Sequence, residues 1–184
     1  MNLETLPPAS ATARLARLTW LDSAAFASAA PPTTVRALSR GGLLVDAIRG
    51  AYGVDPKVEV TREAEAGPNL ERDIELRIGS DTLIEAHSLL PLETVAALPF
   101  LGTLGERAIG LALREHGYDT RSEYAFARAT FPLLPNDGQA AAPTWARRFR
   151  IELPFDDVTI VEVFSPGLLD TLGRDAERAT GSID

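Results

Sequence analysis

An arginine stands among core residues in the stretch ERDIELRI, residues 71–78. Polar and apolar residues alternate there as in a half-buried strand, and Arg72 is in phase with Ile74 and Leu76. A buried guanidinium is costly unless an anion meets it. The sequence therefore predicts that another part of the chain, or a ligand, brings an anion to Arg72.

A carboxyl group has the same placement near the end of the chain, where Glu162 is in phase with Ile160 and Phe164. Two interpretations stay open. In one, Arg72 and Glu162 form an ion pair that stabilises the sheet, which is the more frequent arrangement. In the other, they stand at opposite ends of a closed pocket. Such a pocket suits a small molecule with a carboxylate and a hydroxyl, since arginine grips carboxylates and a desolvated glutamate can exchange protons.

Three further arginines lie in the stretch WARRFRIEL, residues 145–153. Arg147 shares a strand face with Trp145 and Phe149, whereas Arg148 and Arg150 share the other face. One of these arginines would add positive potential to a pocket. Solvated arginines on a strand that is exposed on one side are the more frequent case, however.

Metal and cofactor chemistry has no support in the sequence. The chain has two histidines, His87 and His116, and no cysteine, so the spacing of metal ligands is absent. No glycine-rich phosphate loop and no GxSxG motif occurs. We expect neither a metal nor a cofactor.

The composition of the chain limits the kinds of molecule that it is expected to bind. The 184 residues include 18 basic and 26 acidic side chains, for a net charge of −8, which argues against a nucleic-acid partner. The sequence contains no apolar run near the ~20 residues of a membrane span and no signal-peptide pattern at its start. We expect a cytoplasmic monomer whose partner is a small molecule.

The expected elements are those of a small antiparallel sheet with helices. Strands are predicted over residues 57–63, 72–78, 82–89, 123–131, 145–153 and 158–164. Helices are predicted over residues 35–52, with an interruption at Gly41-Gly42, and over residues 91–98 and 105–116. Short turns favour antiparallel pairs, so the fold class is α+β with a single antiparallel six-stranded sheet and helices packed on one face.

We expect one domain over residues 1–184, with a core of about residues 33–168. The N-terminal segment and the polar tail that follows Gly167 are predicted to be peripheral, and the tail to be loosely held.

Five short motifs resemble, in order, the landmarks of the chorismate lyase family. They are RDI at 72–74, LLP at 89–91, LGERAIG at 104–110, WARRFR at 145–150 and VEVFSP at 161–166. The distance from Arg72 to Pro91 matches the family pattern as well. The resemblance covers about residues 36–168 and implies the same six-stranded antiparallel fold.

The resemblance implies a role for four residues. Arg72 would hold the ring carboxylate of the ligand, together with the backbone of Ile109 at the start of a helix. Leu44 would cover the site as a lid contact. Leu43 stays an alternative, because the pair Leu43-Leu44 departs from the hydroxyl-containing motif of the family. Glu162 would face the hydroxyl end of the ring.

The implied activity is that of a chorismate–pyruvate lyase, a cofactor-free enzyme that forms 4-hydroxybenzoate and pyruvate in a closed pocket, as in ubiquinone supply. Glu162 and Arg72 are the candidate catalytic residues. One alternative is a non-catalytic domain of the same fold that binds a small carboxylate, as in some bacterial transcription regulators. About 35 residues precede the first long helix, too few for a helix-turn-helix domain, which disfavours that alternative. A divergent enzyme that acts on a related carboxylated ring is the other alternative.

Overall fold

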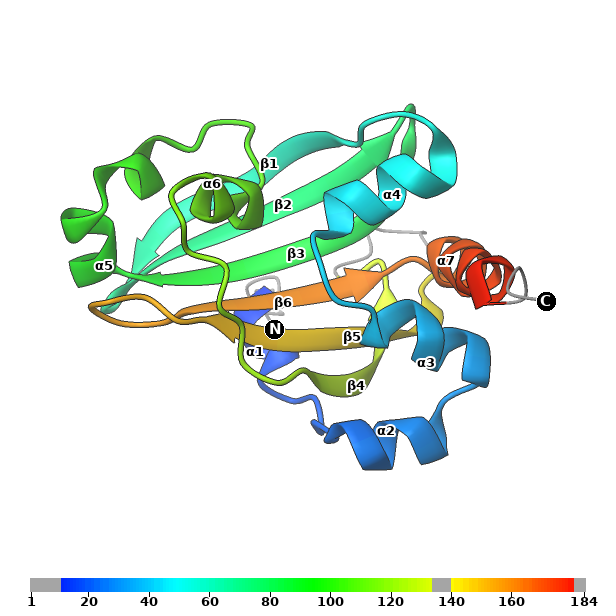
Figure 1. The fold of residues 1–184 in the computed structure, drawn as a ribbon. Helices are drawn as coiled ribbons and strands as arrows, with labels where there is room; N and C mark the ends of the chain where they lie inside the picture. Colours follow the sequence, from blue (N-terminus) through cyan, green and yellow to red (C-terminus); the bar gives the residue numbers. More distant parts are fainter. Residues whose placement is uncertain (1–10, 134–139, 181–184) are drawn as a thin grey trace, which may run out of the picture.

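The computed structural model describes residues 11–133 and 140–180, and its centre is a six-stranded antiparallel sheet (Figure 1). The strand order is β1-β2-β3-β6-β5-β4. The strands are β1 (Lys57–Ala66), β2 (Asn69–Ile78), β3 (Asp81–Pro91), β4 (Ala125–Phe131), β5 (Ala142–Ile151) and β6 (Val158–Phe164). The predicted fold class, α+β with an antiparallel six-stranded sheet, is confirmed.

The helices cover the two faces of the sheet unequally. They are α1 (Ala11–Leu15), α2 (Ser23–Ala29), α3 (Pro32–Ser39), α4 (Leu44–Tyr52), α5 (Leu92–Ala97), the 3-10 helix η1 (Pro99–Thr103), α6 (Ile109–Glu115) and α7 (Pro166–Thr180). In Figure 1, α3, α4, α6 and α7 lie in front of the sheet and α1 lies behind it. We call these two sides the helix face and the α1 face. Within residues 11–133 and 140–180, no helix is long and apolar enough to cross a membrane.

The alternation in β2 separates the two faces as predicted. Ile74 and Leu76 are buried in the main cluster of the helix face, together with side chains of α3, α4 and α7. A second cluster on the same face joins Ile109 of α6 to Phe149 and Ile160. A smaller apolar cluster on the other face packs α1 against the sheet, and its buried members are Ala11, Leu15, Leu133, Ala146, Val161 and Val163.

Glycines set the helix boundaries near the helix face. Gly42 has a φ of 87°, which separates α3 from α4, so the interruption predicted at Gly41-Gly42 is confirmed. The helix predicted over residues 105–116 begins later, at Ile109. Gly105 has a φ of 53°, and this left-handed residue directs the chain through a turn before α6 can start.

The prediction of a loosely held tail after Gly167 is wrong. Residues Pro166–Thr180 form α7, and Leu168, Leu169 and Leu172 are buried in the main cluster of the helix face. Their spacing places them on one side of a helix, while the intervening residues are polar. The first ten residues of the predicted N-terminal segment, and residues 181–184, lie outside the described ranges.

Close packing of α7 against α3 depends on Gly173. A Cβ atom at this position would lie 2.9 Å from both the Cβ and the carbonyl oxygen of Thr33. Gly167, in the same helix, has open space around it. The two glycines therefore differ in packing although both are helical.

We expect Gly173→Ala to be less stable than Gly167→Ala by about 1–3 kcal/mol, the usual cost of forcing extra atoms into a packed contact. Alanine favours a helix at either position, so the comparison isolates the contact with Thr33. Urea unfolding followed by circular dichroism measures the difference. Equal stability of the two variants would show that α3 and α7 separate easily.

Candidate functional site

A cavity of about 50 Å³ lies on the helix face, beneath the first turns of α4 and α6. Its floor is formed by β2, β3, β5 and β6. The polar and charged side chains that line it are Ser88, Arg121, Arg147 and Glu162. Most of the remaining lining is apolar, and a volume of this size holds only a few water molecules.

Most residues that the sequence singled out meet in this cavity. Leu44, Ile109 and Glu162 all line it, although they come from three separate elements. Leu43, the alternative lid contact, lines it too. Arg72 lies on the same face of the sheet, but it is not part of the lining. The roles of these residues in binding or catalysis stay predictions.

Arg72 is buried with partners of its own. Its guanidinium forms an ion pair with Glu63 of β1 and donates to the carbonyl oxygens of Gly105, at 2.5 Å, and Arg107, at 3.3 Å. The side chain is 2% exposed. Arg72 therefore fixes the loop that leads into α6, and its own charge is compensated within the protein.

A β-bulge brings Glu63 to Arg72. The pairing register between β1 and β2 shifts between Val60 and Arg62, so that Val60 lies opposite Ile74 and Glu63 lies opposite Arg72. Without this shift, strict alternation would turn Glu63 to the α1 face. The bulge thus brings to Arg72 the anion that its burial requires.

Glu162 pairs with Arg147, so the first of the two interpretations, an ion pair between Arg72 and Glu162, is wrong. The Nε atom of Arg147 lies 2.5 Å from a carboxylate oxygen of Glu162. The two residues are directly opposite each other on neighbouring strands β5 and β6, whereas β3 separates β2 from β6. Glu162 therefore pairs with the arginine on the adjacent strand and not with the arginine two strands away.

Arg147 also holds the end of α3 in place. Its Nη1 atom donates to the carbonyl oxygen of Leu38 at 3.2 Å, and its guanidinium lies 4.7 Å from the ring centroid of Tyr124. The expectation of solvated arginines in this strand fails for Arg147, which is buried, and holds for Arg150, which is exposed. The sequence does indicate this burial, because the alternation in the strand places Arg147 on the same face as Trp145, which is buried in the core.

Arg121 is the cation of the cavity that sequence reasoning missed. Its Nη1 atom donates to the carbonyl oxygen of Gly42 at 2.7 Å, and its guanidinium lies 5.3 Å from the ring centroid of Phe149. Its Nε atom is buried without a hydrogen-bond partner. None of the ion pairs formed in the described part of the chain includes Arg121. It lies between α6 and β4, where no periodic pattern could mark it.

The cavity combines a cation with spare donors, a compensated carboxylate and apolar walls. Arg121 can offer two parallel N–H groups to a carboxylate. Glu162 can accept a hydrogen bond from a hydroxyl group, and Leu44 and Ile109 can pack against a ring. Across residues 11–133 and 140–180, no three His, Asp or Glu side chains converge as metal ligands do.

Comparison with known proteins leaves the family open. No protein-family model and no curated protein matches this sequence. Among solved structures, the chain is similar to the ligand-binding domain of a GntR-family transcriptional regulator from Bordetella bronchiseptica. The TM-score is 0.42 at 12% identity, over 60% of this chain and 86% of the other. Likeness of this degree says nothing about a ligand of this chain, and the resemblance to chorismate lyase stays a prediction.

The two buried arginines are expected to differ in their contribution to stability. Arg147→Ala leaves Glu162, whose side chain is 12% exposed, without a counter-ion, so we expect a loss of about 3–5 kcal/mol. Arg72→Ala leaves Glu63, which is 39% exposed and can be hydrated. The Arg72→Ala variant should therefore lose only about 1–3 kcal/mol of stability, because the carbonyl groups of the loop are left without a donor.

Urea unfolding at pH 7 measures the stability of both variants. Each variant truncates an arginine to alanine, so the two losses can be compared directly. A larger loss for Arg72→Ala than for Arg147→Ala would contradict the pairing described above.

Proposed function

We propose that the helix-face cavity binds a small planar carboxylate and that the chain is a chorismate–pyruvate lyase. One observation carries the proposal. Leu44, Ile109 and Glu162, which the resemblance selected from distant parts of the sequence, line a single cavity. Neither the composition nor the net charge of the chain would by itself bring these three residues together. The chorismate-specific part of the proposal rests on the five motifs.

In the proposed complex, the ligand carboxylate lies against Arg121. A charge-assisted pair with a carboxylate is stronger than the present hydrogen bond from Arg121 to the Gly42 carbonyl. The ring would lie between Leu44 and Ile109, with its hydroxyl toward Glu162. This assignment differs from the resemblance, which gives the carboxylate to Arg72. The geometry favours Arg121, because Arg72 is already bonded to Glu63 and to loop carbonyls.

Binding requires the cavity to enlarge. Its volume of about 50 Å³ is too small for a ring with substituents, so the segments 42–45 and 108–111 must move apart. Arg121 bonds to one of these segments through Gly42. Exchange of the Gly42 carbonyl for a ligand carboxylate would couple binding to this motion. Release of the product would then need the same opening and could limit turnover.

The proposed reaction needs no cofactor, because aromatisation drives it. The C3–O bond of chorismate breaks and its electron pair leaves with the enolpyruvyl oxygen. The C4 hydrogen leaves as a proton, and the C4–H electrons complete the aromatic ring of 4-hydroxybenzoate. A proton added to the enolpyruvyl methylene gives pyruvate. Glu162, held in place by Arg147, is the candidate group for moving the proton.

A specific observation favours non-catalytic binding as the second candidate function. The Glu162 carboxylate is already compensated by Arg147 at 2.5 Å, which is the arrangement of a structural ion pair. In that case Glu162 would orient the hydroxyl group of a ligand and would transfer no proton.

Incubation of the purified chain with chorismate tests the lyase activity. We expect 4-hydroxybenzoate, followed by absorbance, and an equal amount of pyruvate, followed with lactate dehydrogenase. Glu162→Gln keeps an acceptor for Arg147 but cannot ionise, so turnover should fall by roughly 10²–10⁴, the range typical of acid–base groups. Turnover within a few-fold of the unmodified chain would leave Glu162 a binding residue. Binding of 4-hydroxybenzoate without turnover of chorismate would overturn the lyase assignment and select the second candidate. Absence of both binding and turnover would overturn the whole proposal.

Substitution of Arg121 tests the carboxylate position. We expect Arg121→Gln to weaken binding of 4-hydroxybenzoate by about 10–100-fold, as loss of a hydrogen bond to a charged group predicts. Binding of the neutral isostere 4-hydroxybenzamide should change little. Arg150→Gln is the matched control, since it removes the same charge from the opposite face of the sheet. Calorimetry measures the affinity of both ligands for the unmodified chain and for the two variants. An equal effect of both substitutions would assign the carboxylate elsewhere.

A further inference from the structure

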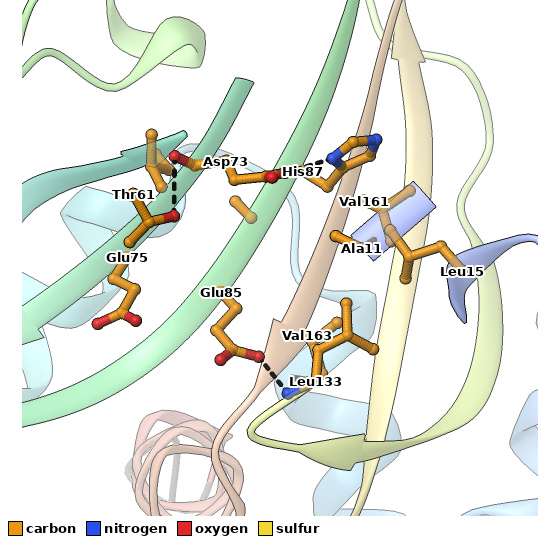
Figure 2. Close-up of a pocket in the computed structure, with 12 residues that line it drawn as sticks. Ala11, Leu15, Thr61, Asp73, Glu75, Glu85, His87, Leu133, Val161 and Val163 are labelled. Atoms are coloured by element: carbon orange, nitrogen blue, oxygen red, sulfur yellow. Dashed lines mark hydrogen bonds and ion pairs between the residues drawn. The ribbon is translucent and has the colours of Figure 1, made fainter. Parts of the chain in front are cut away.

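A second and larger cavity lies on the α1 face of the sheet, with a volume of about 210 Å³. Figure 2 shows its two unlike walls. One wall is apolar and consists of Ala11 and Leu15 of α1, Leu133, and Val161 and Val163 of β6. The other wall is polar and consists of Thr61, Asp73, Glu75, Glu85 and His87 from β1, β2 and β3. The proposed function above makes no use of this cavity.

The carboxylates of the polar wall differ in their partners. Asp73 contacts the Nδ1 atom of His87, and Glu75 lies 3.3 Å from the Nη1 atom of Arg77. Glu85 takes part in none of the ion pairs of the described residues. Its carboxylate accepts a hydrogen bond of 2.5 Å from the backbone N–H of Leu133. Glu85 is therefore a half-buried carboxyl group without a cation.

The surroundings of Glu85 oppose its negative charge. Burial raises the pKa of the Glu85 carboxyl, and the nearby carboxylates of Glu75 and Asp73 raise it further. The hydrogen bond from Leu133 acts in the opposite direction and is outweighed. A cation in the cavity would compensate the charge that the protein leaves uncompensated.

His87 contacts other residues than Glu85 through both of its ring nitrogens, since Nδ1 contacts Asp73. Its Nε2 atom lies 3.4 Å from the hydroxyl of Thr12, which donates to Glu71 at 3.0 Å. Burial opposes ionisation of Glu71, but hydrogen bonds from Arg62 and Thr12 outweigh it and lower the pKa of this carboxyl. This chain of contacts ties α1 to the sheet and leaves Glu85 as the open polar group.

The two walls together select the kind of cation. Across the described ranges, no three His, Asp or Glu side chains are arranged to hold a metal ion. The apolar wall of Leu15, Val161 and Val163 offers no hydrogen bond to a hydrated inorganic ion, whereas it can pack against a hydrocarbon group. A cavity of about 150 Å³ can hold benzene, so the available volume suits one ring with a charged head group.

We propose that the α1-face cavity is a second ligand site, which takes a small organic cation with an amidinium or ammonium group on a single ring or short apolar chain. The charged group meets Glu85, and the apolar body packs against Val161, Val163 and Leu15. The site does not depend on the proposed lyase function, because it lies on the opposite face of the sheet and shares none of the charged residues of the first cavity.

Three probes of nearly equal shape and different charge test this site: benzamidine, benzamide and benzoate. Titration of the whole chain by calorimetry should show benzamidine binding at least about tenfold more tightly than benzamide, with benzoate weaker still at this site. Glu85→Gln should remove the preference for benzamidine. Glu123→Gln, which removes the same charge from an exposed position, should preserve it.

Equal binding of benzamidine and benzamide to the unmodified chain would overturn the proposal. So would an equal loss after Glu85→Gln and Glu123→Gln, since it would mean that benzamidine responds only to the net charge of −8. Arg121→Gln should leave benzamidine binding unchanged. Failure of 4-hydroxybenzoate binding would concern the first cavity alone, so the two proposals can fail separately.

The stability of Glu85→Gln provides a control for folding and a prediction of its own. The pKa of Glu85 is raised above its ordinary value of 4.5 in the folded chain, so the folded state holds this proton more tightly than the unfolded state. Stability contributed by Glu85 is therefore lost as pH rises through the folded pKa. We expect Glu85→Gln to melt at a higher temperature than the unmodified chain at pH 7, and the gain to disappear toward pH 4.

The same titration affects ligand binding. Benzamidine keeps its charge over this range, so its affinity should fall as acid protonates Glu85 in the unmodified chain. Asp73, Glu75 and His87 also line the cavity, and Arg14 donates to the carbonyl of Leu133 at its edge. These groups remain in Glu85→Gln, so the difference between the two pH profiles reports Glu85. Identical profiles would overturn contact between the cation and Glu85.

Discussion

Two buried guanidinium groups control how the helix face is assembled. Burial of a cation is tolerated only where an anion and enough hydrogen-bond acceptors meet it, and this condition fixes what lies next to Arg72 and Arg147. Arg147 bonds to Glu162 and to the last turn of α3. Arg72 bonds to Glu63 and to the loop before α6. Each arginine thus connects a strand of the sheet to a segment that covers it.

The cavity on the helix face occupies the space between these two connections. One connection fixes the chain that leads into α4, and the other fixes the chain that leads into α6, so the first turns of both helices are held over the sheet. Arg121 differs from the two buried arginines, because it bonds to a single carbonyl oxygen and takes part in none of the ion pairs of the described residues, whereas Arg72 pairs with Glu63 and Arg147 with Glu162. Among the described residues, each of the two buried arginines has a carboxylate partner, whereas Arg121, which lines the cavity, has none. This division separates groups that hold the fold from a group that is free to bind.

The two faces of the sheet carry different charged residues, because side chains alternate along each strand. On the helix face, β5 and the loop before β4 bring arginines to the first cavity. On the α1 face, β2 and β3 bring carboxylates to the second cavity. Val161 and Glu162 are neighbours in sequence and line different cavities. A sheet that is covered on both sides can therefore carry two chemically distinct sites at little cost to either.

Local pattern was sufficient for the strands and for the side on which key residues lie. The period of two placed Arg72 and Glu162 on the buried face, and the short connections between strands required antiparallel pairs. Gly41-Gly42 marked the boundary between two helices, because glycine readily adopts a left-handed conformation. These features depend only on residues that are close in the chain, so they can be predicted from a single sequence.

Partners depended on strand order and register, which no local pattern contains. Strand β3 lies between β2 and β6, so Arg72 and Glu162 face the same side without forming a pair. A single shift in register turned Glu63 toward Arg72. Arg121 reached the cavity from a connecting segment without periodicity, and α7 was missed because its three buried leucines stand among polar residues. The sequence by itself determined which side chains point inward; the tertiary structure alone decided what each of them meets, because that depends on segments that are distant in the chain and become neighbours only on folding.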